Sequence, residues 1–465
     1  MEITKESVKV QEALSRVNVD FLDFVKKHPD ALKRSGFKLL ELNDWLFTLQ
    51  PWPTFINRET KKNFREAGVK LFDLIKNIPQ RVFNNDPHKI GEYFNTPVNA
   101  VKIQLEGVNE DHVNYLVGRG DFIISPGGLK CLEYNVTANL GGVQIPIWES
   151  LYLNTPIIAE FLKEYQVKIK NENLISLILG HCIGLPLEKC SHDEEEINIG
   201  IVMSGMGKDS GPNSSEKYIN ELYEKIRYPV KGNRAIKGKV FMCDFPYLTV
   251  TDGYVFYKGT KLQVLIEMYH GILPPKILES FKSGKVYIVN GPMSSLLSNK
   301  LTLALLSDYG NTNCFSDEEK ETIDRYIPWT RKVMPGSTTY GNDTIDDLEH
   351  FIRSNREKLV IKPSRGLGGE GICVGPKSSR EEWEIAVNKA MKEKSWLVQG
   401  YVDSSPGLYQ SGEEGYELQD MVWGFFIVGS RYAGAWNRVM PKKDNRGVIN
   451  CHQGATVSII FEVDE

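Results

Sequence analysis

The sequence lacks the segments and the charge balance that mark membrane proteins and nucleic-acid-binding proteins. None of its apolar runs reaches the ~18 residues that a membrane-spanning helix needs. Residues 1–6 include charged side chains and carry no apolar signal core, so we expect a cytoplasmic protein. The 60 acidic residues outnumber the 56 lysines and arginines, and the net charge of −4 gives no electrostatic reason to bind nucleic acid or an anionic membrane.

Cysteine pairs and a complete P-loop are also missing. The seven cysteines are scattered, odd in number and without a Cys-x-x-Cys spacing, which favours a reducing compartment over a disulfide framework. The glycine-rich stretch 204–211 fails the P-loop pattern, because Val202 and Asp209 stand where that pattern needs glycine and a hydroxyl residue. A loop that binds a substrate anion is the one functional interpretation left for this stretch.

Length and composition indicate a globular chain of several domains. The 465 residues are enough for two to four domains, and 41% apolar with 25% charged residues is ordinary for a soluble protein. Helical periodicity dominates the N-terminal part, whereas strands and helices alternate from residue 197 onward. We predict an α/β (α+β) chain in four parts: a helical region at 1–95, a hairpin and helix at 96–165, a Rossmann-like unit at 166–292 and a second α/β unit at 293–465.

Polar residues alternate along a predicted β-hairpin between residues 118 and 135. Its strands flank the turn residues 126–128, and Arg119 and Asp121 share one face of the first strand. Glu133 and Asn135 share one face of the second strand, with Leu132 and Tyr134 on the other. If the strands pair, two carboxylates and an amide oxygen converge, and these are ligands suited to Mg²⁺. The alternative is a half-buried hairpin whose polar face meets water.

A second group of signals lies in the C-terminal part. The apolar strand 358–363 contains Lys362 and is followed by a glycine-rich loop at 364–371, whose N–H groups would fold over phosphates. Lys362 would reach a phosphate oxygen as a point charge, and a glycine-rich hairpin without a ligand is the alternative. The strand 396–402 offers backbone amides in an apolar setting, which suits the edge of an adenine.

Together these parts resemble the ATP-grasp ligases. The family's magnesium segment reads Arg-x-Asp, a glutamate twelve residues after that Asp, and then Glu-x-Asn, and this chain matches it at Arg119, Asp121, Glu133 and Asn135. The stretches 298–300, 360–371 and 397–402 resemble its two ATP lysines, phosphate lid and adenine hinge. The magnesium segment precedes the lysines, and this order is similar to the circularly permuted group that includes glutathionylspermidine synthetase. The resemblance covers roughly residues 115–145 and 290–440.

The resemblance implies an ATP-grasp fold and a ligase that joins a carboxylate to an amine through an acyl phosphate, with ATP and one or two Mg²⁺ ions as cofactors. The metal ligands it implies are Asp121, Glu133 and Asn135. The residues that would stabilise the transferring phosphoryl group are Arg119 and Arg438, with a surface cation as the alternative for Arg438. The nucleotide ligands are Lys300, Lys362, the lid residues Gly366, Gly368 and Gly369, and the hinge residues Gln399, Gly400, Tyr401 and Val402.

The chain departs from the family at the hinge and in its extent. Gly400 stands where the family usually has an acidic residue, which puts the hinge's affinity for adenine in question. The sequence shows no amidase-type segment with an N-terminal nucleophilic cysteine, so we do not expect the bifunctional synthetase–amidase arrangement. Expected partners are an amino acid, a peptide or a polyamine, and a homodimer is the expected assembly. Two other functions are alternatives to a carboxylate–amine ligase. One is a ligase that loads an amino acid onto a carrier-protein thiol, and the other, from another class, is a non-catalytic ATP-binding regulator.

Periodicity also makes three local predictions about secondary structure. Apolar spacing predicts a single helix over 146–165 and another over 344–354. Alternating apolar residues predict that strand 248–257 pairs with strand 261–269.

Overall fold

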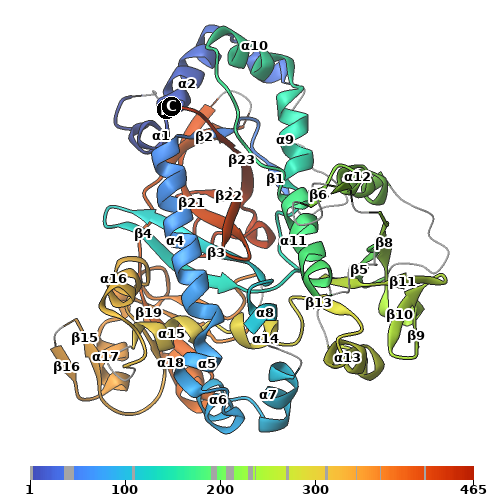
Figure 1. Cartoon of the computed structure of the whole chain (residues 1–465). Helices are drawn as coiled ribbons and strands as arrows, with labels where there is room; N and C mark the ends of the chain where they lie inside the picture. Colours follow the sequence, from blue (N-terminus) through green and yellow to red (C-terminus); the bar gives the residue numbers. More distant parts are fainter. Residues whose placement is uncertain are drawn as a thin grey trace.

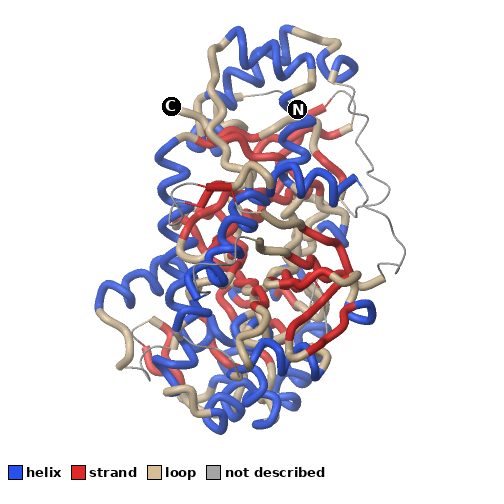
Figure 2. The backbone as a smooth tube through the Cα atoms, turned by 45° about the vertical axis from the view of Figure 1, so that its right-hand side comes forward, coloured by secondary structure: helices blue, strands red, loops and turns tan. Residues whose placement is uncertain are grey.

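The computed structural model describes most of the chain: residues 4–35, 47–106, 110–189, 196–205, 214–228, 234–235, 237–268, 272–308, 313–341, 343–366, 368–412 and 415–465. Most of the glycine-rich stretch 204–211 lies outside these ranges. Figure 1 shows a mixed α/β chain, and Figure 2 shows its strands in the interior with helices mainly around them. Across the ranges given, no helix is both long enough and apolar enough to cross a membrane.

The largest sheet joins the two ends of the chain. Its strand order is β1-β23-β22-β21-β3-β4, with β2 paired to β23 and β20 paired to β21. The strands are β1 (Thr48–Leu49), β2 (Thr54–Ile56), β3 (Val117–Ser125), β4 (Gly128–Asn135), β20 (Gly407–Ser411), β21 (Gly415–Val428), β22 (Arg431–Pro441) and β23 (Thr456–Glu462). The early hairpin β3–β4 therefore lies beside the late hairpin β21–β22, although almost 300 residues separate them in sequence (β3 ends at 125 and β21 begins at 415).

One face of this sheet is covered by the helix α4 (Arg58–Lys76), which runs along it in Figure 1. Phe64 of α4 stacks on Phe425 of β21 at 4.3 Å between ring centroids, and Phe72 stacks on Tyr134 of β4 at 5.6 Å. Burial of such aromatic rings is a main source of packing energy. Because α4 occupies the apolar face, the opposite face of β3 and β4 is left for the polar side chains.

A smaller antiparallel sheet carries the predicted nucleotide lysine. Its order is β14-β19-β17-β18, and Lys362 lies in its third strand. Its strands and the neighbouring elements are β14 (Thr330–Lys332), β17 (Leu359–Pro363), β18 (Cys373–Val374), β19 (Trp396–Gly400), α14 (Ser294–Leu297), α15 (Leu301–Ser307), α16 (Asp317–Tyr326), α17 (Leu348–Ser354), α18 (Arg380–Glu393), β15 (Thr338–Tyr340) and β16 (Asp343–Ile345).

The part between residues 166 and 292 contains a parallel sheet in the order β13-β12-β5-β8, as the alternation of strands and helices predicts. Its elements are α11 (Leu174–Lys189), β5 (Ile199–Met203), α12 (Ser214–Tyr223), β6 (Arg227–Tyr228), β7 (Arg234–Ala235), β8 (Val240–Cys243), β9 (Leu248–Thr251), β10 (Tyr254–Tyr257), β11 (Thr260–Leu262), β12 (Val264–Met268), α13 (Pro275–Lys282) and β13 (Tyr287–Val289). Its finer classification as Rossmann-like and the exact domain limits stay predictions.

The remaining helices lie in the N-terminal third. They are α1 (Lys9–Leu14), α2 (Val17–Lys27), α3 (Ala31–Arg34), α5 (Ile78–Phe83), α6 (Pro87–Phe94), α7 (Val98–Leu105), α8 (Glu110–Val113), α9 (Ile145–Leu153) and α10 (Pro156–Glu164). The region 1–95 is mainly helical, as predicted, but its short strands β1 and β2 also join the central sheet.

Two predicted helices are shorter than the periodicity indicates. The stretch 146–165 forms α9 and α10 because Pro156 begins a new helix and holds Thr155 in an extended conformation. The stretch 344–354 begins with strand residues, and the helix starts only after Asp347, whose side chain accepts a hydrogen bond from the His350 N–H.

The predicted pairing of a strand 248–257 with a strand 261–269 is correct only for β10 and β11. Residues 248–257 are not one strand, because β9 and β10 pair with each other as a hairpin. β11 pairs with β10, whereas β12 leaves to join the parallel sheet. The change occurs at Gln263, which is 8% exposed and exchanges hydrogen bonds with Asn198 through its backbone N–H and its side-chain Oε1. Apolar alternation continues through both strands, so periodicity alone does not show the transfer between sheets.

A buried carboxyl group on α9 gives the first testable prediction. Glu149 accepts a hydrogen bond from the Asn171 side chain, which also bonds β23 at the Ile460 carbonyl. Burial raises the pKa of Glu149 to about 7, and the nearby Glu462 acts in the same direction. Between about pH 4.3, the ordinary value for glutamate, and pH 7, the folded protein keeps a proton that the unfolded chain releases. Stability should therefore fall as pH rises through this window.

We expect Glu149→Gln to raise the free energy of unfolding at pH 8 by roughly 1–3 kcal/mol and to change it little at pH 4.5. Glutamine keeps the acceptor for Asn171 but has no charge to bury. Denaturant unfolding at the two pH values measures the difference. Glu164→Gln, at an exposed position of α10, is the matched control and should show no such pH dependence. An equal effect of Glu149→Gln at both pH values would contradict the assignment.

Candidate active site

The predicted hairpin is present and holds its four polar residues in register. Arg119 pairs with Asn135 and Asp121 with Glu133. Directly opposed residues of an antiparallel pair share a face of the sheet. The polar groups therefore gather on the side of β3 and β4 that α4 leaves free.

A β-bulge corrects one detail of the prediction. Asp121 pairs with Glu133 but the next residue, Phe122, pairs with Cys131, so Leu132 has no cross-strand partner. Leu132 was expected on the face opposite Glu133, yet it lines the same cleft. The bulge also frees the Leu132 carbonyl, which accepts a hydrogen bond from Lys362 Nζ at 3.2 Å.

Asp121 lies at the centre of a buried charge cluster. It is 2% exposed, and its two oxygens accept bonds from Arg119 Nε at 2.7 Å and Nη2 at 2.9 Å. Arg438 Nη2 lies 2.9 Å from Asp121 Oδ2. Burial alone would raise the pKa of Asp121, but the two guanidinium groups outweigh it and hold the pKa well below its usual range.

Arg438 is part of this cluster and not a surface cation. It is 5% exposed on β22, and its Nε has no hydrogen-bond partner among the described residues. Two guanidinium groups share the single carboxylate of Asp121, so the cluster has an excess of positive charge in a buried place. Such an arrangement favours an anion as the missing partner.

The two predicted ATP lysines converge on Glu133. Lys300 Nζ lies 3.2 Å from Glu133 Oε2 and also donates to the Gly366 carbonyl. Lys362 Nζ donates to Gln399 Oε1 at 2.6 Å. Burial lowers the pKa of Lys362 to about 8, against the opposing attraction of Glu133. The hairpin and the C-terminal lysines thus form one site, as the sequence predicts.

The hinge residues differ in which of their hydrogen-bonding groups remain available to a ligand. The Gly400 N–H donates to the Trp329 carbonyl and the Tyr401 N–H to the Lys358 carbonyl. The Gln399 side chain bridges Lys362 and Thr330. Val402 lies against an apolar cluster, and its N–H has no acceptor in the described part of the chain. Of the four hinge residues, Val402 therefore has the free donor that an adenine edge requires.

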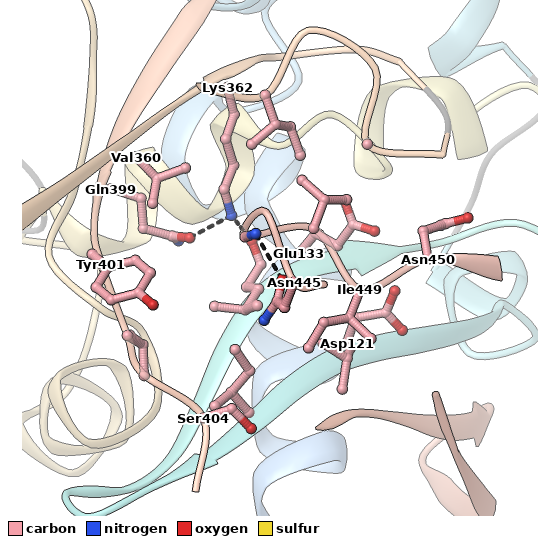
Figure 3. A pocket seen from close by; sticks show the side chains of 18 of the residues that line it. Asp121, Glu133, Val360, Lys362, Gln399, Tyr401, Ser404, Asn445, Ile449 and Asn450 are labelled. Atoms are coloured by element: carbon pink, nitrogen blue, oxygen red, sulfur yellow. Dashed lines mark hydrogen bonds between the residues drawn. The ribbon is translucent and has the colours of Figure 1, made fainter. Parts of the chain in front are cut away.

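A cleft of about 840 Å³, open to solvent at its mouth, runs between these groups. Figure 3 shows Lys362 and Gln399 on one wall and Asp121 with Ile449 on the other. Asp121, Glu133, Lys362 and Arg438 line the cleft together with the hinge residues, among them the apolar Val402.

The segment between β22 and β23 forms a wall of the cleft that sequence reasoning missed. Asn445, Gly447, Val448, Ile449 and Asn450 line it. The Val448 side chain approaches the lid closely, since a Cβ at Gly369 would lie 2.3 Å from Val448 Cγ1. In the sequence this segment is only a mostly polar connection between two strands. Its composition does not differ from that of an ordinary turn, so it gave no indication of a site.

The donor set partly fits a magnesium ion. Glu133, Asp121 and Asn135 provide hard oxygens, and within the described part of the chain the buried Asn135 amide nitrogen has no hydrogen-bond partner. Both Asp121 oxygens already accept from arginines, whereas Glu133 forms an ion pair with Lys300 and with neither arginine among the described residues. No group of three or more His, Cys, Asp and Glu side chains suited to a metal occurs in the residues described. Glu133 is therefore the strongest candidate ligand, and phosphate oxygens would have to complete an ion's shell.

Comparisons with known proteins identify the fold. No protein-family model matches the chain, and no curated protein matches its sequence. Among solved structures, a glutathione synthetase-like effector from Globodera pallida, in its apo form, matches 97% of this chain and 98% of its own at a TM-score of 0.58 and 12% identity. A protein named as a candidate gamma-glutamylcysteine synthetase from Methylobacillus flagellatus covers 82% of this chain and 84% of its own, at a TM-score of 0.39 and 12% identity. The chain therefore has the mixed α/β fold of the glutathione synthetase-like effector.

Proposed function

We propose that this protein is an ATP-dependent ligase that joins a carboxylate to an amine and releases ADP and phosphate. The observation that carries the proposal is the convergence of Glu133, Lys300 and Lys362, from distant parts of the chain, beside the Asp121–arginine cluster. The effector with this fold is named for its likeness to glutathione synthetase, a name that fits amide-bond formation. The early magnesium segment and late lysines fit a circularly permuted ATP-grasp ligase.

The charge distribution supports a polyphosphate ligand. Four cations, Arg119, Arg438, Lys300 and Lys362, lie around two carboxylates, Asp121 and Glu133. The excess positive charge is buried, where electrostatic attraction is stronger than in water. A triphosphate would balance it.

The chemistry assigned to these residues is positioning and charge neutralisation. Lys300 and Lys362 would neutralise the α- and β-phosphates, and Val402 would bind adenine. Magnesium, held by Glu133 with Asn135 and Asp121, would neutralise charge on the phosphates. Arg119 and Arg438 would stabilise the phosphoryl group as it moves to the substrate carboxylate, and the amine then displaces phosphate from the acyl phosphate.

The glycine lid would exclude water from the acyl phosphate. Gly366, Gly368 and Gly369 all have positive φ, which lets the loop fold over the cleft against Val448. Lys300 bonds the Gly366 carbonyl, so the lid and the phosphate-binding lysine are connected. A closed lid of this kind slows hydrolysis and product escape.

We expect Gly369→Ala to speed the dissociation of a fluorescent ATP analogue roughly 10- to 100-fold, because a methyl group 2.3 Å from Val448 opposes closure. Stopped-flow displacement by unlabelled ATP measures the rate. Gly259→Ala is the matched control, since its φ of +80° is close to the +81° of Gly369 but nothing lies within 4 Å of its Cβ. Equal dissociation rates in the two variants would contradict a closing role for the lid.

The ligase proposal is tested by ATP consumption. Purified protein with MgATP is screened against pools of amino acids, peptides and polyamines, and the products are weighed by mass spectrometry. An amide product with stoichiometric ADP supports the proposal. A thioester on an added carrier protein would instead assign a thiol acceptor, and ATP binding without turnover of any pool would favour a regulator.

A further inference from the structure

The indole ring of Trp436 contacts both arginines that bind Asp121. The guanidinium carbons of Arg119 and Arg438 lie over it, 5.4 and 5.6 Å from a ring centroid. Trp436 is 2% exposed. A cation at this distance from an aromatic face is attracted by the ring quadrupole, and more strongly when water is excluded. One aromatic side chain therefore supports two cations that both bind the carboxylate of Asp121.

The register of the central sheet explains how this contact forms. Trp436 on β22 pairs with Gly424 on β21, and Gly424 pairs with Asp121 on β3. The three positions form one row on one face of the sheet. A Cβ at Gly424 would lie 2.3 Å from Trp436 Nε1 and 2.8 Å from Arg119 Cδ. Because residue 424 is a glycine, the indole and the aliphatic part of Arg119 occupy the space that a side chain there would fill.

The glycines Gly141 and Gly142 also lie against the indole. A Cβ at Gly142 would lie 2.9 Å from Trp436 Cδ2, and Gly142 has a φ of +96°. The neighbouring Gly141 carbonyl accepts a bond from Arg119 Nη1 at 2.8 Å. Phe47 meets the indole edge-on at 5.7 Å. Contacts with Gly142 and Phe47 thus fix the position of the Trp436 ring against the two arginines.

We propose that Trp436 is a positioning residue for the phosphoryl end of the site. It orients Arg119 and Arg438 and leaves their positive charge uncancelled. A second carboxylate in its place would neutralise part of that charge. The excess positive charge then stays available to the terminal phosphate, and Arg438 Nε keeps its free N–H. This inference rests on the proposed function, because it assigns the arginines to a phosphate.

The test compares Trp436→Leu with Trp436→Phe. Calorimetry with Mg²⁺ gives the affinities for ADP and for a non-hydrolysable ATP analogue, and their ratio reports the contribution of the terminal phosphate. We expect Trp436→Leu to lower that ratio about tenfold with the ADP affinity unchanged, and Trp436→Phe, which keeps an aromatic face, to retain most of it. Trp383→Leu, at a fully buried tryptophan of another core cluster, controls for loss of stability.

Arginine labelling provides a readout that needs no nucleotide. Arg119 and Arg438 are 8% and 5% exposed, so both should react slowly with phenylglyoxal in the parent protein. Peptide mass spectrometry should show faster labelling of both in Trp436→Leu and unchanged labelling in Trp383→Leu. An unchanged ratio in Trp436→Leu, equal losses in the leucine and phenylalanine variants, or unchanged labelling would overturn the role of Trp436. A parent protein that binds neither nucleotide would refute the proposed function, and the labelling rates would still decide whether Trp436 positions the arginines.

Discussion

Replacing Glu133 by glutamine is expected to abolish ATP-dependent turnover and to leave the fold intact. Glutamine keeps the size of the side chain but removes the charge that faces Lys300 at 3.2 Å and that would bind the metal. Loss of several kcal/mol of charge stabilisation corresponds to a fall in kcat of roughly 10²-fold or more. ADP release with the substrates found by screening measures the rate, and thermal unfolding with circular dichroism checks the fold.

Glu66→Gln is the matched control for this variant. Glu66 lies 3.3 Å from Lys70 on the surface of α4, and its side chain is 32% exposed against 28% for Glu133. The two pairs have the same chemistry, but only one lines the cleft. We expect full activity in Glu66→Gln, and full activity in Glu133→Gln would remove Glu133 from the metal and phosphate site.

The hairpin could be predicted because its signals are local. The turn residues 126–128, the alternation of Arg119 with Asp121 and that of Glu133 with Asn135 fix the strand type and face without knowledge of distant segments. The lysines were found from the motif they sit in, since Lys362 ends an apolar strand before a glycine-rich loop. The structure brings these groups together, but their roles in catalysis stay predictions until the variants are measured.

The remaining parts of the site depend on contacts between distant strands. Arg438 reaches Asp121 only because β22 follows β21 in the sheet and β21 lies beside β3. The need for glycine at position 424 becomes clear only when Trp436 and Arg119 are known to lie beside it. β1 and β2 have two and three residues, too few for a periodic pattern, and their pairing with β23 is set by tertiary contacts.

The bulge at Leu132 also could not be predicted from local sequence signals. Sequence alternation assigns Leu132 and Glu133 to opposite faces, and a single extra residue shifts this assignment. The shift has a structural consequence, because the freed Leu132 carbonyl binds Lys362. A register change of one residue therefore connects the hairpin to the β14-β19-β17-β18 sheet, and no pattern in residues 128–135 alone signals it.

Lys362→Met is expected to weaken ATP binding roughly 10- to 100-fold, because a hydrogen bond from a charged donor contributes about 1.5–3 kcal/mol. Methionine keeps the apolar stem that fills the space beside Gln399. The affinity of the parent protein should also depend on pH. Burial lowers the pKa of Lys362 to about 8, so its ammonium loses its proton as pH rises through 8. ATP affinity should fall over that range, and binding near pH 8 should take up protons.

Isothermal titration calorimetry at pH 7 and pH 9, in buffers of different ionisation enthalpy, measures both effects. Lys332→Met is the matched control: Lys332 lies on β14 of the same sheet, burial lowers its pKa, and its Nζ donates to the Tyr93 carbonyl at 2.6 Å, away from the cleft. It should bind ATP as the parent protein does. Unchanged affinity in Lys362→Met would count against the whole nucleotide assignment, whereas a pH dependence that persists in that variant would assign the titration to another group. A loss confined to Lys362→Met would therefore assign the effect to the lysine that lines the cleft and contacts the bulge at Leu132.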